Sequence, residues 1–209
     1  MSTRNLIRWS GLISLLAGLL FALAAFIHPA GETLADFLSP NWVTAHLLGW
    51  VSLILMQLGL MGLYARQVEK TGWLGLVGFI LAFIGTAFGG AIQFMSGTVI
   101  PLVAAEAAAI FDQARTAATF ALPLLPLGFG LGYLLFGIGT MRASVLPRWS
   151  GLLMSIGVSF FVFAIFLQEV SLLSGPLPHA IGDSGAAVFG LGLVWMGYAL
   201  WSEKREPAK

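Results

Sequence analysis

Polar side chains stand at matching positions in three apolar segments of the chain. Each segment opens with a Trp-x-Gly-Leu motif, and the three motifs begin at Trp9, Trp73 and Trp149. Nineteen or twenty residues after each tryptophan, about 29 Å along a helix, come polar groups: His28, Gln93, and the pair Gln168 and Glu169. Imidazole, amide and carboxylate groups form a hydrogen-bonding site if the segments converge, and ordinary polar helix ends if they do not.

A second polar set lies on the helix predicted for residues 41–64. Its members follow at steps of four, four, seven and seven residues, which places them on one helical face: Trp42, His46, Trp50, Gln57 and Tyr64. Gln57 falls near the middle of the apolar stretch, where an unpaired amide is costly, so we expect this face to point into a bundle. Either the face is the wall of a small-molecule pocket, or Gln57 simply bonds a neighbouring helix.

The three histidines of the chain, His28, His46 and His179, are candidate metal ligands. Imidazole and carboxylate groups suit zinc, copper or iron, and two histidines from neighbouring helices also suit the axial positions of a haem. No short ligand spacing joins the three, and the motifs of zinc proteases, serine hydrolases and nucleotide-binding loops are absent. A metal or haem site is therefore an alternative, and no cofactor is predicted.

The composition is that of a membrane protein. Of the 209 residues, 58% are hydrophobic and only 9% are charged, against about 25% charged in soluble domains. The formal net charge of +1 provides no basic field for nucleic acid. The absence of cysteine excludes disulfides and thiolate sites.

Six apolar stretches have the roughly 20 residues that a membrane-spanning helix needs. They cover residues 7–28, 41–64, 72–97, 118–141, 147–169 and 185–202. The first could pass for a signal peptide, but its opening motif recurs inside the chain, so we expect it to be retained. Pro123 and Pro126 predict a kink in the fourth stretch, and Asp183 or Ser184 would cap the sixth. Residues 97–117 could hold a helix lying on the membrane surface.

The basic residues predict the orientation. Nine of the ten fall on one side of the predicted spans: Arg4, Arg8, Arg66, Lys70, Arg142, Arg148, Lys204, Arg205 and Lys209. Because cytoplasmic loops are enriched in lysine and arginine, we expect a multi-pass protein of the plasma (inner) membrane with both termini in the cytoplasm. The three histidines then lie on the opposite side, and residues 203–209 form a cytoplasmic tail.

The recurring motif predicts three tandem hairpins, at residues 7–66, 72–142 and 147–202, within a single transmembrane domain that covers residues 1–209. The fold class is thus an all-α polytopic bundle of six helices with pseudo-threefold symmetry. The glycine pairs Gly85/Gly89 and Gly128/Gly132, each four residues apart, predict close helix packing.

Three functions agree with these features. The first is a non-enzymatic membrane protein that binds or moves a small uncharged or lipophilic molecule through an outward-facing pocket. Its site residues would be His28, His46, Trp50, Gln57, Gln93, Gln168 and Glu169. The second is an accessory subunit of a membrane complex, or a homo-oligomer, and the third is a metal- or haem-dependent membrane enzyme. We favour the first. No charged residue falls in the middle of a predicted span, which argues against ion-coupled transport, since such transporters usually need one there.

Overall fold

The computed structural model describes residues 2–31, 33–106, 125–169 and 176–203, without the side chains of residues 105, 106, 168, 169 and 176. The described residues form helices and no strands, as predicted. The elements in chain order are α1 (Thr3–Ile27), α2 (Leu34–Phe37), α3 (Pro40–Glu106), the π-helix η2 (Leu125–Gly130), α5 (Leu131–Ala143), α6 (Arg148–Glu169) and α7 (Pro176–Ser202).

Four helices among the described residues are long and apolar enough to cross a membrane. They cover Thr3–Ile27, Pro40–Ala104, Arg148–Leu167 and Leu177–Ser202. Large apolar side chains such as Phe26, Leu102 and Phe163 are more than half exposed. Exposed apolar surface on this scale suits lipid rather than water as the surrounding solvent, which is consistent with an integral membrane protein.

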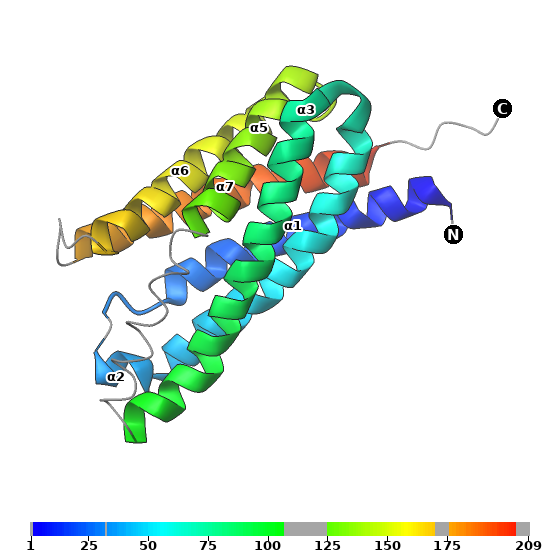
Figure 1. Cartoon of the computed structure of the whole chain (residues 1–209). Coiled ribbons are helices and arrows are strands. Elements are labelled where there is room, and N and C mark those ends of the chain that lie inside the picture. Colours follow the sequence, from blue (N-terminus) through cyan, green and yellow to red (C-terminus); the bar gives the residue numbers. More distant parts are fainter. Residues whose placement is uncertain (1, 32, 107–124, 170–175, 204–209) are drawn as a thin grey trace.

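Helix α3 reverses direction at Gly72. The backbone there has φ 56° and ψ −154°, a conformation that side chains with a Cβ rarely adopt. The two arms, residues 40–71 and 73–106, then run antiparallel and side by side (Figure 1). The rings of Tyr64 and Phe79 stack at 4.5 Å near the bend, and Trp42 Nε1 donates to the carbonyl of Ser96 at 2.8 Å far from it.

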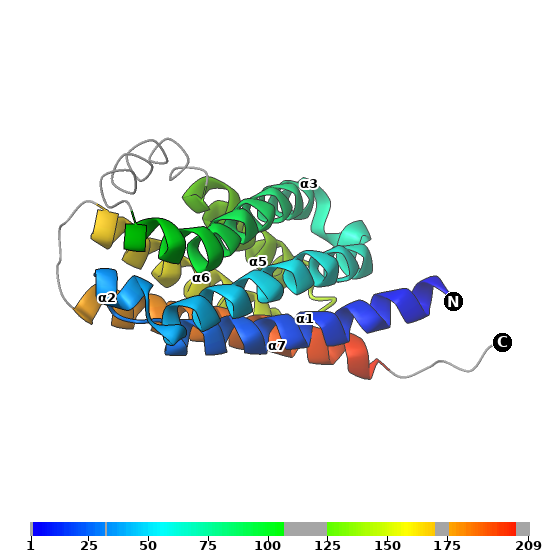
Figure 2. The same ribbon diagram turned by 90° about the horizontal axis from the view of Figure 1, so that it is seen from below.

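The helices follow one another around the bundle in chain order. The first arm of α3 packs on α1 and its second arm on α5, α5 packs on α6, and α6 packs on α7. Helix α7 then returns to α1, which closes the ring (Figure 2). Every neighbouring pair is antiparallel, so the bend at Gly72 lies at the same end as the start of α1 and the end of α7. We call this the Gly72 end, and the opposite end the α2 end.

Glycines bring neighbouring helices into backbone contact. A Cβ at Gly85 would collide with the backbone of Phe129, and one at Gly132 with the backbone of Ala82. Gly128 lies directly against Gly85, whereas Gly89 leaves an ordinary contact of 3.4 Å to Leu53. The predicted close approach is therefore confirmed at three of the four positions, and it joins α3 to η2 and α5.

Aromatic rings fill the centre of the bundle. Phe21 of α1 contacts Phe129, Phe161 and Phe189, with ring centroids 5.4 to 6.1 Å apart. Tyr133 lies beside Phe189 at 4.9 Å. Rings from five elements thus interlock where the helices surround the axis, which makes the centre a packed core.

The buried hydroxyl groups of Thr86 and Tyr133 in this core both have hydrogen-bond partners. Thr86 donates to the carbonyl of Ala82 at 2.7 Å, so the contact of 2.9 Å between Thr86 and Tyr133 must be a bond that the Tyr133 hydroxyl donates. Both hydroxyl groups are therefore satisfied inside the apolar core.

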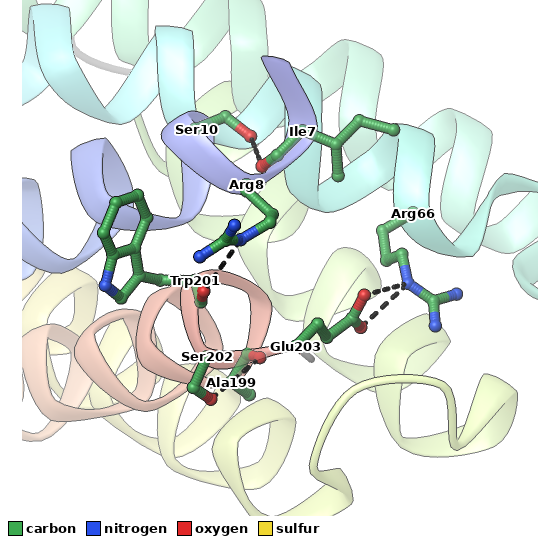
Figure 3. A network of polar contacts seen from close by, with 8 residues as sticks. All are labelled: Ile7, Arg8, Ser10, Arg66, Ala199, Trp201, Ser202 and Glu203. Carbon is green, nitrogen blue, oxygen red and sulfur yellow. Dashed lines mark hydrogen bonds and ion pairs between the residues drawn. The ribbon is translucent and has the colours of Figure 1, made fainter. Parts of the chain in front are cut away.

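The end of α7 is attached to two other helices at the Gly72 end (Figure 3). Arg8 Nε donates to the carbonyl of Trp201 at 3.2 Å, and its guanidinium lies 5.0 Å from the centre of the Trp201 ring. Arg66 Nε donates to both carboxylate oxygens of Glu203, at 2.9 and 3.1 Å. Glu203, predicted as part of a tail, is therefore bound to the bundle.

Several predicted boundaries were wrong. Helix α7 begins at Pro176 rather than residue 185, so Asp183 and Ser184 lie inside the helix and cap nothing. Proline is tolerated in a first helical turn, where its missing N–H has no partner to lose. The second arm of α3 continues past residue 97 to Glu106. Pro126 lies in η2, in agreement with a distortion there, whereas Pro123 and the rest of residues 107–124 lie outside the described residues.

Candidate functional site

Four aromatic side chains meet at the α2 end of the bundle. His28 lies 5.0 Å from the Trp42 ring and 4.9 Å from the His46 ring, centroid to centroid, and Trp42 and His46 lie 4.3 Å apart. Phe37 meets the Trp42 ring edge-on at 4.7 Å. We call these four residues the histidine–tryptophan cluster. It joins α1, α2 and the first arm of α3.

Local sequence places each ring. Proline at position 29 ends α1, so His28 is the C-cap in an extended conformation, with its N–H bonded to the carbonyls of Ala24 and Ala25. Trp42 and His46 are four residues apart on α3 and share one face. Both side chains are buried, with exposed fractions of 4% and 7%.

Phe37 is positioned by a short helix with its own cap. Thr33 and Asp36 form a reciprocal capping box at the start of α2, in which the Thr33 N–H and hydroxyl donate to Asp36 Oδ2 at 2.9 and 2.6 Å. These bonds from Thr33 hold the pKa of the exposed Asp36 carboxyl below 3.8, and the nearby charge of His28 lowers this pKa further. The box keeps Phe37 over Trp42.

Both imidazole rings are held in one tautomer. His28 Nδ1 lies 2.7 Å from the carbonyl of Pro29, and His46 Nδ1 lies 2.8 Å from the carbonyl of Trp42. A carbonyl oxygen only accepts, so Nδ1 must carry the proton in each ring. In a neutral ring, Nε2 is then a hydrogen-bond acceptor.

A second acceptor comes from Gln93 on the second arm of α3, which contacts the first arm one turn beyond His46. The side chain of Gln93 fits against Gly49, where a Cβ would come within 3.1 Å of the Gln93 amide. The amide oxygen, Oε1, is buried and has no hydrogen-bond partner. The ring of Trp50 lies beside Phe94 at 5.1 Å on the same two arms. Gly49 follows His46 by three residues. Gln93, which contacts Gly49, therefore meets the first arm on the turn next to that of His46.

Gln57 lies apart from this cluster. It is eleven residues beyond His46, about 16 Å along the helix. Its Nε2 donates to the carbonyl of Phe83 at 3.2 Å, so the side chain joins the two arms of α3. This bond is the simpler of the two roles expected for Gln57.

The predicted convergence of three polar helix ends can be followed for two of them. His28 and Gln93 both lie against the first arm of α3, on adjacent turns. The side chains of Gln168 and Glu169 lie outside the described residues, although the backbone of α6 extends to Glu169. His179 is half-buried in the first turn of α7, one turn before Asp183.

No family model, curated protein or solved structure matches the chain.

The histidine–tryptophan cluster does not have the geometry of a haem site. The rings of His28 and His46 contact each other, so no macrocycle fits between them. In the described part of the chain, no three His, Cys, Asp or Glu side chains are grouped as metal ligands.

The sequence predicted His28, His46, Trp50 and Gln93 as site residues, but Trp42 and Phe37 were not among the predicted site residues. The signal for Trp42 was present, because it lies four residues before His46 on the same polar face. Phe37 had no such signal, since its place depends on the capping box of a four-residue helix.

Proposed function

We propose that the chain is a six-span membrane protein, without enzymatic activity, that binds a small uncharged or lipophilic molecule at the α2 end. The reversal at Gly72 supports the count of six, since it makes α3 two antiparallel arms, each longer than one crossing needs. Residues 125–143 would complete the fourth span. With the basic residues near the Gly72 end, this end faces the cytoplasm and the site faces outward.

Three tandem hairpins are supported by the motifs that open them. Trp9, Trp73 and Trp149 are each at least half exposed, whereas the glycine two residues later is buried each time. Each of these glycines also faces the helix segment that comes before it around the ring. The contacts are Gly11 with Gly197, Gly75 with Thr71, and Gly151 with Gly137.

The acceptors at the site set the ligand chemistry. The unpaired Oε1 of Gln93 carries the proposal, because a buried acceptor without a partner is costly unless a donor reaches it. His46 Nε2 would accept from a second donor, and Trp42 and Trp50 would contact the apolar part. The ligand class is thus a small lipophilic molecule with hydroxyl or N–H groups.

Binding is better supported than passage along the bundle axis. The interlocked rings around Phe21 fill the centre below the site. A molecule at the α2 end would meet packed aromatic side chains rather than a polar path. We therefore propose reception or retention of the ligand at the outer face.

The accessory-subunit alternative has less support. Membrane helices that join a partner often present small residues at the contact. Apart from Gly72, each glycine in the described helices would bring a Cβ within 4 Å of other atoms of this chain. The glycines therefore pack against other parts of the same chain. Homo-oligomers or larger complexes would have to form through large apolar side chains.

Native mass spectrometry of the gently extracted protein, with metal analysis of the same sample, tests the proposal. We expect a small molecule bound to the 22.2 kDa chain. It should be lost from His46→Phe and Gln93→Leu and kept by Gln57→Leu, the matched control from the same hairpin. A chain without a bound molecule, or a ligand that the first two variants keep, would overturn the proposed ligand site. A stoichiometric metal would replace it with the metal-site alternative.

A further inference from the structure

A second polar group is buried at the Gly72 end, far from the histidine–tryptophan cluster. Gln67 and Thr71 lie one turn apart at the end of the first arm of α3, and Thr140 lies on α5. Their exposed fractions are 1%, 7% and 0%. Gln67 Nε2 donates to Thr140 Oγ1 at 2.9 Å, which joins α3 to α5.

Two atoms of this group have no hydrogen-bond partner. These are Gln67 Oε1 and Thr71 Oγ1, and both are buried. Each such group costs about 1–3 kcal/mol when it is left unpaired. In the aromatic core, by contrast, the buried hydroxyl groups of Thr86 and Tyr133 are hydrogen-bonded to each other. Gln67 Oε1 needs a donor, and the Thr71 hydroxyl can both donate and accept.

Two glycines bring the backbone close against Thr71. A Cβ at Gly75 would run into the Thr71 side chain, including its Oγ1. A Cβ at Gly139 would lie 3.3 Å from the Cα of Gly75 and 3.8 Å from Thr71 Cγ2. The group is thus closely packed, and any occupant beside the hydroxyl must be very small.

The polar atoms of the group favour a neutral occupant. A buried cation would need negatively charged ligands, and Gln67, Thr71 and Thr140 carry no charge. An anion is excluded by Gln67 Oε1, which only accepts. A water molecule both donates and accepts, and it typically takes two to four such partners when buried.

We propose that Gln67, Thr71 and Thr140 bind one water molecule between the reversal of α3 and the end of α5. The water donates to Gln67 Oε1 and bonds the Thr71 hydroxyl, while Thr140 holds the Gln67 amide in place. This site is independent of ligand binding at the α2 end.

Two variants of Thr71 test the proposal by the sign of their effect in thermal unfolding of the purified protein. Thr71→Val keeps the shape of the side chain and removes the hydroxyl, whereas Thr71→Ser keeps the hydroxyl. If the water is bound, Thr71→Val lowers the melting temperature by about 2–4 °C and Thr71→Ser has the smaller effect. If the hydroxyl has no partner, its removal raises the melting temperature, and the proposal fails.

A crystal structure from a lipid mesophase, at a resolution that shows ordered water, completes the test. Wild-type protein should show one water peak within hydrogen-bond distance of Gln67 Oε1 and Thr71 Oγ1, and the Thr71→Val variant should not. A direct bond between Gln67 and Thr71, or a peak with the coordination of a metal ion, would overturn the proposal.

Discussion

His28 and His46 differ from surface histidines in how little freedom their rings have. Each ring donates from Nδ1 to a nearby backbone carbonyl and contacts the other ring. Such a bond fixes both the tautomer and the ring orientation. His46 therefore does not need to reorganise before it accepts a hydrogen bond at Nε2, which is a condition for tight binding of a small ligand.

Trp42 should be the residue of this cluster that matters most for stability. Trp42→Phe removes the bond from Nε1 to the carbonyl of Ser96, and we expect it to destabilise the protein by about 1–2 kcal/mol. Denaturant unfolding in detergent measures this change. Trp73→Phe is the control, since Trp73 is 81% exposed and its replacement should have an effect within about 0.5 kcal/mol. Equal effects of the two variants would contradict the role given to Trp42.

Only some features of the site could be predicted from the sequence. His28 and His46 could be predicted to lie near one membrane face, because both fall near the same ends of adjacent spans. The unpaired oxygen of Gln93 could not be predicted, since it depends on the fit of the side chain against Gly49. Helical spacing gives the face on which a residue lies but not its partner across an interface.

At the scale of the elements, the stability of α2 should depend on pH. The pKa of Asp36 is lowered, mainly by the side-chain and backbone bonds from Thr33. A lowered pKa means that the carboxylate stabilises α2 fully above its unfolded value of 3.8. That stabilisation is lost as the pH falls through the lowered pKa.

Amide chemical shifts of Thr33 and Asp36, followed by NMR from pH 7 to pH 2, test this expectation. Both signals should move as α2 loses its cap below about pH 4. Asp36→Asn should abolish the transition, since its amide does not titrate in this range. A transition that persists in this variant would assign the pH dependence to another group.

The reversal of α3 depends on Gly72 for conformational reasons alone. Nothing lies within 4 Å of a Cβ at this position, so Gly72→Ala adds no collision. The positive φ should still make the variant less stable, by about 1–3 kcal/mol. Gly89→Ala is the matched control within the same helix, and it should be neutral or slightly stabilising. If thermal unfolding in detergent showed no loss for Gly72→Ala, the described backbone at the bend would be wrong.

Element boundaries were the least predictable part of the fold. Apolar runs predicted the existence of the helices, but α7 begins at Pro176, nine residues before the predicted span of residues 185–202. The helix of the first arm also continues beyond the apolar run, through Arg66 and Lys70. Charged residues are good helix formers, so hydropathy locates the membrane-crossing part of a helix rather than its ends.

At the scale of the whole molecule, the orientation can be tested without background labelling because the chain contains no cysteine. Ala35→Cys lies in α2 and Lys70→Cys lies beside the reversal, and both positions are exposed. A membrane-impermeant maleimide applied to intact cells should label the first variant. It should label the second only after permeabilisation. The opposite pattern would reverse the proposed topology.

The closed ring of helices has a consequence for connectivity. Gly11 and Gly18 of α1 meet Gly197 and Gly190 of α7 backbone to backbone, as closely as helices that are joined by a loop. The start of α1 and the end of α7 also lie at the same end of the bundle. The order of the helices in space is thus cyclic. A chain that began at a different helix could follow the same order around the ring. A circularly permuted chain that is opened at the reversal of α3, with a short linker from α7 to α1, would keep every interface of the bundle.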